Sequence, residues 1–203
     1  MSELRVALTF DAEHPSRATH RPGADGEILD VLGRAGVRAT FFLQGRWASA
    51  HPALARRVAE EGHVVGNHSH HHGPMTLLSD EGIRLDVVRS AERIAEVTGA
   101  DPRPWFRCPF GEGAEDPRVL AQLRDLGYRN VHWSIDPGDW REGASPPGVA
   151  SAVLNELGSS PGGAIVVFHT WPGVTPEAVG LVVDRLAADG ATFVTAPEIV
   201  DAA

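Results

Sequence analysis

The sequence has few of the features that mark disulfide-bonded, membrane-spanning or nucleic-acid-binding proteins. Its 203 residues include one cysteine, Cys108, so no internal disulfide can form and a reducing compartment is favoured. No apolar run approaches the roughly 18 residues that span a bilayer, and the N-terminus shows no signal-peptide pattern. The net charge of −9 argues against a nucleic-acid partner or a basic membrane anchor. We therefore expect a cytoplasmic protein, or an extracellular one if a leader peptide has been removed.

The length and composition are those of one globular domain. Hydrophobic residues make up 42% of the chain and charged residues 22%, as in soluble proteins with a buried core. The sequence contains no internal repeat, low-complexity tract or interdomain linker. We therefore expect a single domain over residues 1–203.

Short apolar segments alternate with amphipathic ones along the chain. The predicted strands are rich in Val, Ile, Phe or Trp and bounded by Gly, Pro or Asp; they cover residues 5–10, 39–43, 63–66, 105–107, 130–134, 164–168 and 191–195. The predicted helices begin at Asp25, Pro52, Ser79, Asp116-Pro117, Ser145-Pro146 and Thr175-Pro176. This alternation predicts an α/β fold of parallel strands joined by helical crossovers. About seven strands are too few for the usual eight-fold barrel, so a distorted or incomplete barrel fits, and an open doubly wound sheet is the alternative.

Ionisable residues follow the carboxyl ends of five predicted strands. They are Asp11, His68, Arg107, the pair Asp136 and Asp139, and His169. In parallel α/β folds, ligands bind and catalysis occurs at this edge. We therefore expect these side chains to belong to one site.

The densest polar signal is the histidine-rich run at residues 67–72. Histidines four residues apart lie on one helical face and can share a metal ion, which favours His68 with His72 over His68 with His71. A solvated histidine-rich loop is the alternative. Asp11 and Glu13 follow the first strand and could supply carboxylate ligands, although alone Asp11 could cap a turn and Glu13 could be solvated.

Three further residue types near these strand ends have competing interpretations. Arg107 ends a strand and is expected to pair with a carboxylate. Cys108 could be a nucleophile, but a small buried thiol is the commoner use of cysteine. Trp140 and Trp171 could form walls for a sugar ring, or could pack in the core.

Five short motifs in fixed order resemble the NodB-homology domain of polysaccharide deacetylases, carbohydrate esterase family 4. They are Thr9–Ala12, His68–His72, Arg107–Gly111, Asp136–Trp140 and the strand 165–168 leading to His169. Each motif is weak alone, but five in order over residues 4–200 are specific. The resemblance implies a distorted (β/α)7 barrel and a hydrolase that deacetylates N-acetylated sugars, such as an N-acetylglucosamine-containing glycan, or cleaves a related amide.

The resemblance also implies roles for the matching residues. Asp11 matches the general base, and Arg107 matches the arginine that orients this base. His68 and His72 match the two histidine metal ligands. The remaining matches are His169 as the general acid, Asp139 as the carboxylate that tunes it, and the backbone N–H of Phe110 as an oxyanion donor.

The first motif departs from the family pattern. The family usually has two adjacent aspartates, the second a metal ligand, whereas this chain has Ala12, which cannot bind metal. Some relatives place the ligand two residues after the base, so Glu13 is the expected third ligand and His14 the alternative. A site with two protein ligands, or with no physiological metal, stays open. Zinc suits imidazole and carboxylate ligands, and cobalt or nickel could substitute.

Two rival functions remain at this point. Relatives of this fold open cyclic amides or imides, as in an allantoinase-like branch, and the altered first motif leaves room for such a small amide substrate. A catalytically impaired glycan-binding module is the other rival, and Ala12 is its only support. The sequence does not indicate an oligomeric state.

Overall fold

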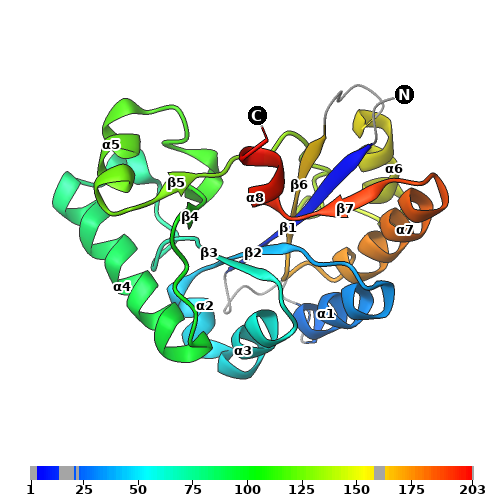
Figure 1. Ribbon diagram of the computed structural model, residues 1–203, viewed down its shortest axis with the longest axis horizontal. Coiled ribbons are helices and arrows are strands. Elements are labelled where there is room, and N and C mark those ends of the chain that lie inside the picture. Colours follow the sequence, from blue (N-terminus) through cyan, green and yellow to red (C-terminus); the bar gives the residue numbers. More distant parts are fainter. Residues whose placement is uncertain (1–3, 14–20, 22, 158–162, 203) are drawn as a thin grey trace. The chain divides into compact units, whose positions relative to one another are not determined.

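The computed structural model describes residues 4–13, 21, 23–157 and 163–202 (Figure 1). These divide into two compact units. Unit 1 contains residues 4–10, 21, 23–40, 133–157 and 163–202, and unit 2 contains residues 11–13 and 41–132. His14, an alternative metal ligand, lies outside the described residues. None of the helices among them is long and apolar enough to cross a bilayer.

Unit 1 is built on the strands β1 (Arg5–Ala12, of which residues 5–10 belong here), β6 (Ala164–His169) and β7 (Thr192–Val194). β1 pairs in parallel with β7 and neighbours β6. The helices are α1 (Ala24–Ala35), α6 (Pro146–Leu157), α7 (Thr175–Ala188) and α8 (Ala196–Val200). α7 packs against both α1 and α6 (Figure 1). Both β1 and β6 are almost wholly buried, as parallel strands covered by helices should be.

Unit 2 has the strand order β5-β4-β3-β2. The strands are β2 (Thr40–Leu43, of which residues 41–43 belong here), β3 (Val64–Asn67), β4 (Trp105–Phe106) and β5 (Arg129–Asn130). The helices are α2 (Gly45–Ala50), α3 (Pro52–Glu60), α4 (Asp80–Thr98) and α5 (Pro117–Asp125), with the short 3-10 turns η1 (Met75–Leu77) and η2 (Pro109–Gly111). α4 packs against α2, α3 and α5 (Figure 1). The long helix α4 therefore contacts each of the other three helices of unit 2.

All seven predicted strands occur, but two details of the prediction are wrong. The strand expected at 130–134 ends at Asn130, and Ile135 instead makes an isolated bridge to Val166. Asp25 does not cap α1, because Gly23 occupies the N-cap in a left-handed conformation and Asp25 lies in the first turn. Two short helices, α2 and α8, lack a long apolar period and were not predicted.

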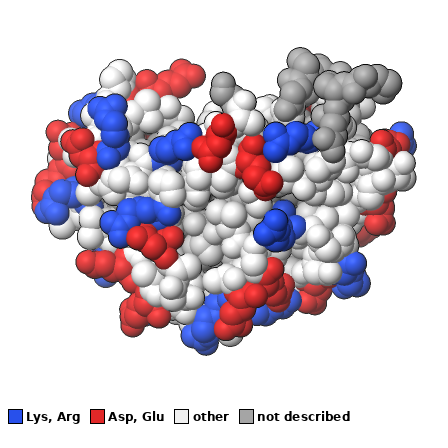
Figure 2. Space-filling view, viewed as in Figure 1, with Lys and Arg blue, Asp and Glu red and all other residues white. Residues whose placement is uncertain are grey.

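Charged side chains are mixed on the surface. On the face that Figure 2 draws, acidic and basic side chains lie interspersed, without one broad basic patch. Several form local pairs, such as Arg84 with Glu81 and Arg103 with Asp101. The face that Figure 2 draws therefore lacks the clustered basic side chains typical of a nucleic-acid-binding surface.

Candidate active site

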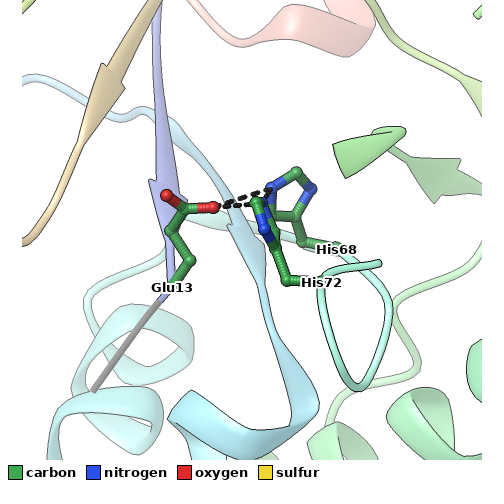
Figure 3. Close-up of side chains that lie close together, drawn as sticks. All are labelled: Glu13, His68 and His72. Atoms are coloured by element: carbon green, nitrogen blue, oxygen red, sulfur yellow. Dashed lines mark hydrogen bonds and ion pairs between the residues drawn. The ribbon is translucent and has the colours of Figure 1, made fainter. Parts of the chain in front are cut away.

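The segment after β3 brings His68 and His72 together, although not as a helix. We expected their four-residue spacing to place them on one helical face, and this reason is wrong. The segment is a loop that passes through left-handed conformations at Ser69 (φ 63°) and His72 (φ 59°). The His72 N–H donates to the Ser69 hydroxyl at 3.0 Å, closing the loop. As a result the two Nε2 atoms face each other at 3.1 Å (Figure 3).

Glu13 brings a carboxylate to the two imidazoles. Its Oε2 lies 3.5 Å from His68 Nε2 and makes a closer ion pair with His72 Nε2 (Figure 3). Successive side chains of an extended chain point to opposite sides, so Asp11 and Glu13 share a side that Ala12 does not. Candidate ligand atoms of Glu13, His68 and His72 all lie within 4.8 Å of one another. The alternative that Glu13 is a solvated loop residue is wrong, because the side chain is buried.

A hydrogen bond at Nδ1 of His68 determines which of its two ring nitrogens carries the proton. Nδ1 lies 2.9 Å from the carbonyl oxygen of Arg107. Because a carbonyl oxygen only accepts, Nδ1 carries the proton and the neutral ring presents the Nε2 lone pair to the cluster. Metal-binding histidines are commonly held through their other nitrogen in this way. Two imidazole nitrogens and one carboxylate oxygen are a donor set that suits zinc.

Burial and charge shift the pKa values of the two histidines in opposite directions. Burial alone would lower the pKa of His68, but the negative charges of Asp11 and Glu13 outweigh it and the pKa is raised. Burial lowers the pKa of His72 and outweighs the hydrogen bond that its ring donates to Glu13, which acts in the opposite direction. In the absence of a metal ion, a proton is therefore held more firmly at His68 than at His72.

Asp11 and Arg107 form a buried ion pair beside this cluster. Arg107 Nη1 donates to Asp11 Oδ1 at 2.8 Å, as the sequence predicted for a strand-end arginine. The guanidinium also donates from Nε to the Val131 carbonyl at 3.1 Å and lies over the Phe42 ring at 4.1 Å. Asp11 Oδ2 lies 3.6 Å from His68 Nε2. Three strand ends of unit 2 therefore bring Asp11, His68 and Arg107 together.

In unit 1, Asp139 holds the ring and the backbone of His169. The Nδ1 atom of His169 lies 2.8 Å from Asp139 Oδ1, and its backbone N–H donates to Oδ2 at 2.8 Å. The Thr175 hydroxyl also donates to Oδ2 at 2.8 Å. The sequence indicated Thr175 only as a helix start, so this contact was missed. Asp136 has a different use, since it accepts the N–H of Gly138 within a turn.

The aromatic candidates differ in exposure. Phe110 is 56% exposed, has a left-handed φ of 58° and contacts the His72 ring with centroids 4.4 Å apart. Trp140 is 45% exposed and remains a candidate wall for a sugar, whereas Trp171 is 4% exposed, which favours the core interpretation. Cys108 is buried and burial raises its pKa to about 12, so the thiol is a poor nucleophile at neutral pH.

Sequence comparison relates this chain to sugar deacetylases. The family model for polysaccharide deacetylase matches residues 1–131. The chitooligosaccharide deacetylase of Rhizobium leguminosarum bv. trifolii is 39% identical over 178 residues, which are 88% of this chain and 76% of that protein. A peptidoglycan-N-acetylglucosamine deacetylase of Bacillus cereus is 32% identical over 202 residues, covering 98% of this chain and 69% of that one.

Solved structures share the fold. A family 4 carbohydrate esterase from Streptomyces lividans, in complex with acetate, matches with a TM-score of 0.80 and 30% identity over 93% of this chain and 91% of that one. A pseudoenzyme of the same family from Bacillus anthracis matches with a TM-score of 0.84 and 27% identity, over 98% of this chain and 66% of that one. These matches confirm the predicted NodB-like (β/α) barrel. The chain belongs to the polysaccharide deacetylase family.

Proposed function

We propose that this chain is a metal-dependent hydrolase that removes acetyl groups from N-acetylated sugars of an N-acetylglucosamine-containing glycan. The observation that carries the proposal is the cluster of Glu13, His68 and His72 beside the Asp11–Arg107 pair. The named activities of the two deacetylase relatives support the same substrate class. Extension of one domain over residues 1–203 and a cytoplasmic location remain predictions.

The metal ligands in this proposal are Glu13, His68 and His72. Zinc is the proposed ion because its usual ligands are imidazole nitrogen, thiolate and carboxylate oxygen, and cobalt or nickel could substitute. When bound, the ion would supply Lewis-acid activation of water and of the acyl carbonyl. The Phe110 N–H would donate a hydrogen bond to the oxygen on which negative charge develops.

Asp11 is the proposed general base. Arg107 donates to Oδ1, which fixes the orientation of the carboxylate. The other oxygen, Oδ2, would accept the proton of the attacking water. The buried ion pair therefore leaves one oxygen of the base for the reaction.

His169 is the proposed general acid. Its Nδ1 faces Asp139 Oδ1, so the carboxylate stabilises the doubly protonated ring. The proton on Nε2 would then pass to the nitrogen of the departing amine. Asp139 acts through His169 and does not itself transfer a proton.

Acetate release tests the proposal. The purified protein should release acetate from N-acetylglucosamine oligomers, and a chelator should stop the release. His68→Ala should lose both metal and turnover, whereas His169→Ala should keep the metal and lose turnover. Release of acetate that survives both substitutions would overturn the proposal. Turnover of a cyclic amide with none of the oligomer would favour the allantoinase-like rival, and metal-free protein without turnover would favour the impaired module.

A further inference from the structure

The loop between the two histidine ligands is anchored to α4 through one acidic side chain. Asp86 Oδ2 accepts the backbone N–H of His70 at 2.9 Å, and Oδ1 accepts that of His71 at 3.2 Å. Asp86 itself is buried. One carboxylate therefore accepts hydrogen bonds from two consecutive backbone N–H groups in the loop between His68 and His72.

A second side chain of α4 holds the start of the same loop. The Ser90 hydroxyl donates to the Ser69 carbonyl at 2.9 Å, and the Gly45 N–H donates to the same oxygen at 3.0 Å. Ser69 has a positive φ, which residues with a side chain seldom adopt without support. The packing is close, because a Cβ on Gly45 would lie 2.4 Å from His70 Nδ1 and 3.0 Å from Ser90 Cα. The loop therefore rests directly on α2 and α4.

We propose that Asp86 is a positioning residue for the metal site. By fixing the peptides of His70 and His71, it would hold His68 and His72 in the ligand geometry before an ion arrives. This inference rests on the metal site proposed above and adds a residue that touches neither the ion nor the substrate. A preorganised site binds more tightly because less chain must be ordered on binding.

The chemistry of Asp86 makes the proposal specific. Both oxygens of a carboxylate accept, which matches two backbone N–H donors. Asparagine has nearly the same shape but offers one oxygen and one NH2 group, and that group would face an N–H. Asp86→Asn should therefore release one of the two peptides while the side-chain volume stays the same.

Zinc affinity, measured by competition with a chelating dye, separates positioning from simple packing. Asp86→Asn should bind zinc about 10–100-fold more weakly than the parent chain, the range seen when partners of ligands are removed. Proton NMR should also show faster hydrogen exchange at the His70 or His71 amide of the metal-free variant. The matched control is Glu96→Gln, which removes a charge from the same helix at an exposed ion pair with Arg93. It should bind zinc as the parent does.

The outcomes distinguish this inference from the proposed function. If His68→Ala loses zinc while folded Asp86→Asn keeps the parent affinity, the role of Asp86 is overturned and the metal site stands. If His68→Ala binds zinc as tightly as the parent, the metal site itself fails. Should Asp86→Asn not fold, Ser90→Ala takes its place. A several-fold loss of zinc affinity there supports anchoring by α4, and an unchanged affinity overturns it.

Discussion

Arg107 pairs with one oxygen of the Asp11 carboxylate, and the other oxygen faces His68. Arg107 Nη1 lies 2.8 Å from Asp11 Oδ1, while Oδ2 of the same group lies 3.6 Å from His68 Nε2. Both side chains are buried. The arginine therefore neutralises a charge that would otherwise be costly in the interior, and it leaves the second oxygen directed at the cluster.

Asp11→Asn should lower the free energy of unfolding by about 3–5 kcal/mol, because it leaves the Arg107 charge buried without its partner. Denaturant titration of the metal-free protein measures this. The matched control is Asp101→Asn, since Asp101 pairs with Arg103 at the surface and its loss should cost at most about 1 kcal/mol. Equal stabilities for the two variants would show that the buried pair does not hold this part of unit 2 together.

Ala12→Asp should not create a metal ligand. Ala12 is fully buried, and its side chain points away from the side shared by Asp11 and Glu13. A carboxylate there would lack a partner, so we expect a loss of several kcal/mol in stability. In the double variant Ala12→Asp, Glu13→Ala, zinc content measured by atomic absorption should stay low. Recovery of zinc would mean that the adjacent-aspartate arrangement is accessible to this chain.

Zinc affinity should rise with pH. The raised pKa of His68 means that a proton competes for Nε2 up to a pH above the ordinary value of about 6.5. The folding stability of the metal-free protein should change with pH in the opposite direction. The stability that the raised pKa of His68 provides is fully present below about pH 6.5, and it is lost as pH rises through the pKa of the folded state. Zinc titrations between about pH 5 and 8 measure the first effect. An affinity that does not change over this range would contradict proton competition at His68.

Cys108 should be inert in the folded protein. With a pKa of about 12 the buried thiol stays protonated at neutral pH. Iodoacetamide should therefore label the chain only after unfolding, as mass spectrometry would detect, and Cys108→Ala should retain acetate release. Rapid labelling of the native protein, accompanied by loss of turnover, would restore the cysteine as a nucleophile.

The sequence predicted the fold class and the approximate positions of all seven strands, because most of these strands are short apolar runs. Continuous apolar runs indicated β1 and β6. The spacing of His68 and His72 selected two imidazoles whose Nε2 atoms lie 3.1 Å apart. The prediction that His68 and His72 lie on one helical face was wrong. No periodic pattern in the sequence indicates a loop with left-handed residues at Ser69 and His72.

Two contacts of buried polar groups, those of Asp86 and Thr175, could not be predicted. Helical periodicity places Asp86 on the buried side of α4, but it does not tell which loop meets that side. Thr175 reaches Asp139 across 36 positions, and a Thr-Pro pair signals only a helix start. Trp140 and Trp171 were equivalent in the sequence, and only burial separates them.

Zinc binding by Glu13→Ala tests most directly whether this carboxylate completes the site in place of the missing aspartate. The parent chain should bind about one zinc ion per molecule, the number that one cluster can hold. Glu13→Ala should bind it at least about 100-fold more weakly, since loss of a ligand should exceed the loss of an outer partner. Acetate release should fall with the zinc content. A Glu13→Ala variant that keeps the parent's affinity and turnover would contradict the assignment of Glu13.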